Sequence, residues 1–133
     1  AAAGIPAPHP NVTRWAIGGH SLGGELAASY AAKHADEYAA LMLLAAYSTA
    51  ALPEEIAVIS IYGDADGVMD REKYAQYRPN LPGNTLEVIL AGGNHAQFGD
   101  YGTQFNDGKA KISKKKQLDI TLKHIMKFMK KYA

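Results

Sequence analysis

A serine set between glycines joins two segments of different hydrophobic pattern near the start of the chain. The motif GHSLG runs from Gly19 to Gly23 and follows residues 13–17, which are a candidate for a short strand. From Ser21 to about His34 the apolar residues recur at helical spacing. Gly-x-Ser-x-Gly between a strand and a helix is typical of a sharp turn that presents a nucleophilic serine, and its glycines remove side chains that would collide across the turn. A glycine-rich turn without a catalytic role is the alternative.

Three further apolar segments predict the rest of a parallel sheet. Residues 41–46 and 56–62 are continuous apolar runs, as expected for strands buried on both faces, and residues 85–90 form a fourth candidate strand. Because strands alternate with helical segments, we predict an α/β fold, with a parallel sheet of about four strands flanked by helices. Residues 1–11, rich in alanine and proline, are expected to be an irregular lead-in, and residues 12–133 to form one domain.

Two helices are expected after the first. Residues 70–77 predict a short helix that Asp70 begins or caps and Pro79 stops. Ser113 offers an N-cap for a closing helix. The apolar residues of that helix predict a stripe that covers the sheet, formed by Leu118, Leu122, Ile125, Met126 and Met129.

Charge is distributed unevenly along the chain. The formal net charge is +1, but nine lysines after residue 108 stand against a single acid, Asp119. We expect these lysines to form a solvated face of the closing helix, and an anionic partner is the alternative. The lysines have no aromatic residues interleaved among them and no nucleic-acid-binding motif is present, so no nucleic-acid partner is expected.

The sequence limits the compartment only weakly. No apolar run approaches the roughly 20 residues that a membrane-spanning helix needs, and the first ten residues do not resemble an intact signal peptide. The absence of cysteine excludes disulfides and thiolate metal sites, but it fits cytosolic and secreted proteins alike. We therefore expect a soluble protein without an integral membrane segment, either cytoplasmic or secreted.

A nucleophilic serine needs a base, and the base needs an acid that orients it. His95 follows the fourth predicted strand, where its ring could reach Ser21, whereas His20 is expected to point away and the other histidines to be solvated or packed. Asp66 follows the third strand and is the preferred acid, while Asp64 is expected to bond nearby backbone N–H groups. All three groups then lie at the C-terminal ends of strands, the edge where open α/β sheets bind ligands.

The chain order Ser21, Asp66, His95 resembles that of the α/β-hydrolase superfamily, in particular its small bacterial branch related to dienelactone hydrolases and carboxylesterases. Three motifs carry the resemblance, which spans residues 12–130: GGHSLGG, IYGDADGV and GGNHAQFGDYG. It implies a serine hydrolase that cleaves carboxylic esters through an acyl-enzyme, without metal or organic cofactor. The same resemblance implies Ser21 as nucleophile, His95 as base, Asp66 as acid, and the Leu22 N–H as one oxyanion donor.

The resemblance is incomplete at the start of the chain. Members of the superfamily have further strands before the serine turn, and a loop after one of them supplies a second oxyanion donor. Residues 1–11 do not resemble that loop, so the strand before Ser21 is expected at an open sheet edge, which is prone to association.

Different functions therefore stay open. The first is an esterase with a small-molecule substrate, for which Tyr47, Phe98 and Tyr101 are candidate pocket residues. Ester, lactone and amide substrates are not distinguished. The second is an impaired or non-catalytic fragment that acts by association, as a homo-oligomer or with a missing N-terminal segment. A third is binding to anionic membranes through the closing helix.

Overall fold

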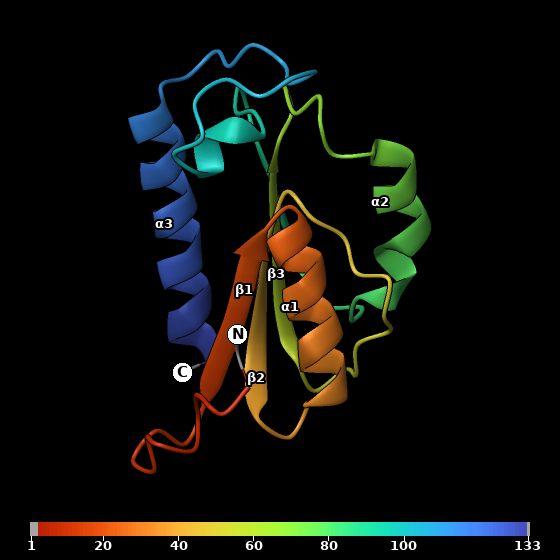
Figure 1. The fold of residues 1–133 in the computed structure, drawn as a ribbon, viewed down its shortest axis with the longest axis vertical. Coiled ribbons are helices and arrows are strands. Elements are labelled where there is room, and N and C mark those ends of the chain that lie inside the picture. Colours follow the sequence, from red (N-terminus) through yellow and green to blue (C-terminus); the bar gives the residue numbers. More distant parts are fainter. Residues whose placement is uncertain (1–2, 133) are drawn as a thin grey trace.

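Four parallel strands form one sheet in the order β1-β2-β3-β4, so neighbours in the sheet are also neighbours along the chain (Figure 1). The computed structural model describes residues 3–132. The strands are β1 (Trp15–His20), β2 (Tyr38–Leu44), β3 (Ala57–Gly63) and β4 (Leu86–Leu90). The predicted α/β class and the four-stranded parallel sheet are confirmed.

Helices cover both faces of this sheet. Their bounds are α1 (Leu22–Lys33), α2 (Arg71–Tyr77) and α3 (Lys114–Tyr132), with 3-10 turns η1 (Arg78–Asn80) and η2 (Ala96–Phe98). α1 packs on β1 and β2, whereas α3 packs on β2, β3 and η2. Figure 1 shows α1 and α3 on opposite sides of the strands, with α2 farther along the sheet.

Alternate residues of β2 divide the core into two parts. Leu41 and Leu43 belong to the apolar cluster beneath α1, while Ala40 belongs to the cluster beneath α3. This division follows from the two-residue period of a strand, which sends successive side chains to opposite faces. All seven residues of β3 are buried, so this strand lies in the middle of both clusters.

α3 packs through a different face from the one that its apolar residues predict. Its buried residues are Gln117, Thr121 and Phe128. By contrast, Leu118, Leu122 and Met126 are 37%, 57% and 51% exposed, while Ile125 and Met129 are partly buried against the core. The predicted stripe is therefore wrong in part. The helix is rotated so that the amide of Gln117 can bond the loop after β4, which hydrophobic periodicity does not reveal.

The helices and strands begin and end within a few residues of the positions that the sequence predicts. Residues 3–14 contain turns but no helix or strand. Asp70 caps α2 by accepting the Lys73 N–H at 3.0 Å, and Ser113 accepts the Lys116 N–H at 3.1 Å before α3, as predicted. Within residues 3–132, no helix has the length and apolarity that crossing a membrane requires.

Candidate active site

Ser21 lies in a strained turn between β1 and α1. Its backbone has φ 54° and ψ −129°, in a region that residues other than glycine seldom adopt. The turn is held by the Ser21 N–H, which donates to the carbonyl oxygen of Leu44 at 2.9 Å, and by the Gly24 N–H, which donates to the Ser21 carbonyl at 2.9 Å. Strain of this kind persists where the surrounding structure enforces it, and it is concentrated at functional sites.

The glycines of this turn have different roles. A Cβ on Gly19 would lie 2.5 Å from the backbone of Gly23, so only glycine fits at position 19, as predicted. A Cβ on Gly23 would meet nothing within 4 Å, so the predicted collision at that position is wrong. The second crowded glycine is Gly24, whose Cβ would lie 2.6 Å from the Cβ of Ala46 and 2.8 Å from the Gly19 carbonyl oxygen. The backbone of Gly23, not its missing side chain, is what approaches β1.

Leu22 begins α1 directly after the serine. As the first helical residue, its N–H has no partner within the helix and lies at the positive end of the helix dipole. This position suits a donor to an oxyanion, and it is the one the sequence predicts.

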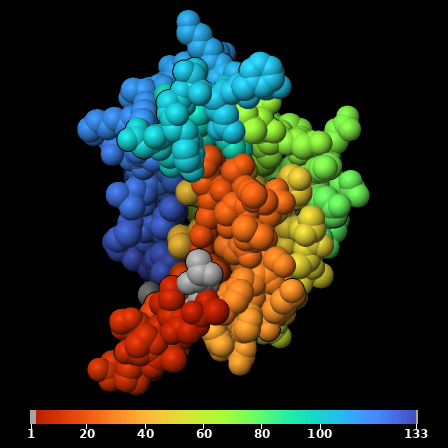
Figure 2. Space-filling view, viewed as in Figure 1, coloured from red at the N-terminus to blue at the C-terminus, as the bar shows by residue number. Residues whose placement is uncertain are grey.

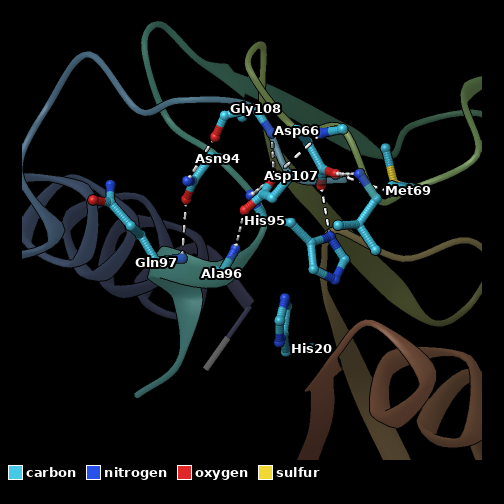
Figure 3. Close-up of polar contacts among 12 residues, drawn as sticks. His20, Asp66, Met69, Asn94, His95, Ala96, Gln97, Asp107 and Gly108 are labelled. Atoms are coloured by element: carbon cyan, nitrogen blue, oxygen red, sulfur yellow. Dashed lines mark hydrogen bonds and ion pairs between the residues drawn. The ribbon is translucent and has the colours of Figure 1, made fainter. Parts of the chain in front are cut away.

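A carboxylate and an imidazole are bonded at the ends of β3 and β4. Asp66 Oδ2 accepts the Nδ1–H of His95 at 2.8 Å, and both side chains are buried (Figure 3). The other carboxylate oxygen, Oδ1, accepts the N–H groups of Val68 and Met69 at 2.8 Å each. Burial alone would raise the pKa of Asp66, but the hydrogen bonds from His95, Met69 and Val68 outweigh it and hold the pKa below its ordinary value.

This bond sets the chemistry of the His95 ring. A carboxylate that accepts Nδ1–H leaves the lone pair on Nε2, the atom through which a histidine acts as a base. Within residues 3–132 the buried Nε2 of His95 has no hydrogen-bond partner, and Ser21 is not bonded to it. The two side chains nevertheless line one cavity of about 390 Å³, together with His20, Leu22, Gly23, Tyr101 and Gln104.

The sequence pattern of the Alpha/beta hydrolase family matches residues 1–119. The chain belongs to the alpha/beta hydrolase family. No curated protein matches it.

A solved structure shares the fold. The crystal structure of a predicted CIB-like hydrolase from Thermoplasma acidophilum aligns with a TM-score of 0.60 at 14% sequence identity. The alignment covers 90% of this chain and 54% of that chain, so this alpha/beta hydrolase chain spans about half the length of its structural neighbour.

One of the three predicted pocket residues lines the cavity in this alpha/beta hydrolase. Tyr101 lines the cavity beside Ser21, but Tyr47 and Phe98 do not. Tyr47 stacks on Tyr77 with ring centroids 5.5 Å apart, and Phe98 is buried in the core cluster beneath α3. Gln104, in the same polar loop as Tyr101, is a lining residue that the sequence analysis did not single out.

His20 is also part of the site, contrary to the expectation that it points away. Its ring lies 4.5 Å from the ring of His95, centroid to centroid, and its Nδ1 is 3.1 Å from the Tyr101 hydroxyl. Burial and the neighbouring His95 lower the pKa of His20. The turn at Ser21 does not by itself reveal these contacts, because they depend on the loop after β4, which folds back over the His20 ring.

Asp107 fixes the backbone of the His95 loop, and the sequence analysis missed it. Its Oδ1 accepts the His95 N–H at 3.1 Å and its Oδ2 accepts the Ala96 N–H at 2.8 Å (Figure 3). Oδ1 also accepts the Gly67 N–H at 3.2 Å, which ties the loop after β4 to the loop that carries the acid. The only signal in the sequence is that a glycine, Gly108, follows this aspartate. In the structure a Cβ at Gly108 would overlap the backbone of the acid loop.

α3 anchors the same loop from its other side. Gln117 is fully buried, and its Oε1 accepts the Asn94 N–H at 3.1 Å while its Nε2 donates to the Asn94 carbonyl oxygen at 2.8 Å. The Gln97 amide donates to the same Oε1 at 2.8 Å. The position of His95 therefore depends on an element far along the chain.

The acid loop has its own anchor in Arg71. One guanidinium nitrogen donates to the carbonyl oxygens of Gly63, Asp64 and Asp66 at 3.1, 3.1 and 3.2 Å. Asp64 bonds the Gly92 N–H at 2.8 Å and so confirms the structural role predicted for it. Among residues 3–132 no three metal-ligating side chains gather at a common point, either here or elsewhere.

Proposed function

We propose that the chain is a serine hydrolase that cleaves carboxylic esters through a Ser21–His95–Asp66 triad and an acyl-enzyme. The observation that supports this most strongly is the 2.8 Å bond between Asp66 and His95, beside a strained serine that lines the same cavity. A histidine with a purely structural role would need neither a buried carboxylate on Nδ1 nor an Nε2 that is buried without a hydrogen-bond partner among residues 3–132.

The reaction proceeds by proton transfer within the triad. Ser21 Oγ attacks the ester carbonyl carbon as His95 Nε2 takes its proton, and the imidazolium then gives that proton to the departing alkoxide. Water attacks the acyl-enzyme with His95 again as base, which releases the acid and restores Ser21. The Ser21–His95 hydrogen bond is expected to form when substrate binds, since such bonds tighten in the complex. This route uses no metal and no organic cofactor.

Negative charge on the carbonyl oxygen is received at the start of α1. The Leu22 N–H is the proposed donor, aided by the dipole of the helix. A second donor would come from outside the described site, and its loss typically costs about a hundredfold to a thousandfold in turnover.

Hydrolysis of nitrophenyl acetate tests the proposal. Ser21→Ala should abolish the release of nitrophenolate above the uncatalysed rate, whereas Ser29→Ala, on the same helix, should leave it unchanged. His95→Ala should lower kcat by about a hundredfold to ten-thousandfold, the range for loss of a general base. Equal turnover by the wild type and Ser21→Ala would contradict the proposal.

Association without catalysis is the second candidate function. Within residues 3–132 β1 pairs only with β2, which leaves its outer edge open, and Leu22 and Leu26 are 65% and 63% exposed on the adjacent helix. An open edge with apolar neighbours is a template for another chain. A chain that stays monomeric in light scattering while it hydrolyses esters would contradict this alternative.

A further inference from the structure

Three aromatic rings lie in a row along the cavity beside Ser21, and two of them are stacked. The His20 ring packs against the His95 ring with centroids 4.5 Å apart, and Tyr101 stacks on His20 at 5.5 Å with an interplanar angle of 22°. Figure 3 shows His20 on the side of the His95 ring away from Asp66. The base is thus held between a carboxylate and a second imidazole.

The second imidazole is itself held in place. The Tyr101 hydroxyl lies 3.1 Å from His20 Nδ1, and the Phe98 ring lies 5.7 Å from the His20 ring. Tyr101 packs directly over Gly99, where a Cβ would lie 2.2 Å from the tyrosine ring. The loop after β4 therefore fixes the orientation of the His20 ring, while β1 fixes the His20 backbone.

Both rings have a buried nitrogen that lacks a partner. Within residues 3–132 the Nε2 atoms of His20 and His95 are inaccessible to solvent and make no hydrogen bond. A buried nitrogen without a partner costs free energy, and such a group in a native structure calls for a functional explanation. For His95 the explanation is that Nε2 is kept free to accept the proton of Ser21.

We infer that His20, held by Tyr101, is a positioning residue that fixes the His95 ring and shields its Nε2 from bulk water. Packing on one face prevents the His95 ring from rotating about its hydrogen bond to Asp66. Shielding from bulk water limits the proton exchange of Nε2 to the serine and to the water molecule that hydrolyses the acyl-enzyme. Burial and the neighbouring His95 lower the pKa of His20, which favours the neutral form of this ring beside the imidazolium that forms on His95 during attack. This inference rests on the proposed function for its catalytic consequence, but the packing of His95 is measurable without catalysis.

The Nδ1 proton of His95 provides a readout that does not depend on turnover. A proton held in a buried bond to Asp66 should give a resolved downfield resonance that exchanges slowly with water, and Asp66→Asn should remove it and so assign it. In His20→Ala we expect this resonance to broaden through faster exchange. In His20→Phe, which keeps a ring in the same place, we expect it to persist. Tyr101→Phe should show an intermediate rate of exchange.

Ester turnover supplies the second readout. His20→Ala should lower kcat by about a hundredfold, the effect of a displaced catalytic group, with little change in KM. His20→Phe should recover most of that loss. The matched control is His34→Ala, which removes a histidine that stacks on Tyr30 at 4.1 Å outside the site and should alter neither readout.

The outcomes separate the two proposals. If His20→Ala keeps the wild-type resonance and kcat, or if His20→Ala and His20→Phe lose both equally, the positioning role is overturned. Urea unfolding of each variant shows whether a lost resonance reflects an unfolded chain. If the His20 variants are unfolded, Tyr101→Phe, which is the smallest change, tests the positioning role through the exchange rate of the Nδ1 proton. If the wild type shows no turnover that depends on Ser21, the proposed function fails, while the resonance still decides the role of His20.

Discussion

The residues around Ser21 differ sharply in how much space surrounds their backbone. At Gly19 a methyl group would lie 2.5 Å from the Gly23 backbone, whereas at Gly23 it would face open space. The two glycines of the motif are therefore not equivalent, and alanine substitutions at them should have opposite effects on stability.

Gly19→Ala should destabilise the chain, and Gly23→Ala should not. Overpacking at a tight backbone contact costs about 1–3 kcal/mol. Alanine in place of glycine within α1 should stabilise by roughly 0.5–1 kcal/mol, because it reduces the entropy of the unfolded chain. The free energy of unfolding in urea measures both changes. Similar losses of stability in the two variants would contradict the geometry of the turn.

His20 and Asp66 predict how stability depends on pH. The folded pKa of His20 lies below its ordinary value of 6.5, so the unfolded chain binds a proton first and stability falls as pH drops below 6.5. The folded pKa of Asp66 lies below 3.8, so its contribution is present above that pH and is lost as pH falls further.

Urea unfolding at a series of pH values tests the histidine part of this dependence. The wild type should lose stability between pH 7 and the folded pKa of His20, and His20→Phe should show a flatter dependence over that interval. Identical slopes for the two proteins would show that His20 does not carry a lowered pKa.

At the residue scale, the sequence predicted groups whose position follows from strand ends. Asp66 and His95 come directly after consecutive strands of a parallel sheet, so their meeting is a consequence of topology, and the structure brings them to 2.8 Å. The contributions of His20 and Asp107 depend on how the irregular loop at residues 99–113 folds back. Neither the hydrophobic periodicity of the sequence nor the spacing of its motifs predicts the path of such a loop.

Among the secondary-structure elements, α3 shows where a hydrophobic pattern is insufficient. Periodicity predicted the helix and Ser113 predicted its cap. The predicted core stripe includes Leu122, whereas the buried residues are Gln117, Thr121 and Phe128. Apolar residues mark a buried face only where burial is decided by apolar area. Here the buried face also carries the Gln117 amide, which bonds Asn94 and Gln97.

Substitutions on α3 test this orientation. Gln117→Ala leaves the partly buried Asn94 N–H without its acceptor and should destabilise by about 1–3 kcal/mol. Leu122→Ala removes a side chain that is 57% exposed and should change stability by less than about 0.5 kcal/mol. A larger loss for Leu122→Ala than for Gln117→Ala, measured by thermal or urea unfolding, would restore the orientation that the sequence predicts.

For the whole molecule, one edge of the sheet, at β1, is left open within the described chain. β1 has a single neighbour within the described chain, and exposed apolar side chains lie on both flanking helices: Leu22, Leu26, Leu118, Leu122 and Met126. In Figure 2 the segments of β1 and α1 occupy the middle of the face shown, with α3 to the left. Exposed apolar side chains beside an open sheet edge favour association.

Self-association is therefore expected to rise with concentration. A double variant, Leu26→Glu with Leu122→Glu, places charge on both helices and should shift the chain toward monomer, while a paired change of exposed residues on α2 should not. Sedimentation velocity over a range of concentrations measures this. A wild-type chain that remains monomeric throughout would contradict the expectation.

Covalent labelling with a fluorophosphonate, read by intact mass and peptide mapping, tests the central claim most directly. We predict one adduct, on Ser21, which disappears in Ser21→Ala and forms far more slowly in His95→Ala and Asp66→Asn. An adduct on another residue, or labelling of Ser21 at the same rate with and without His95, would contradict the proposed triad.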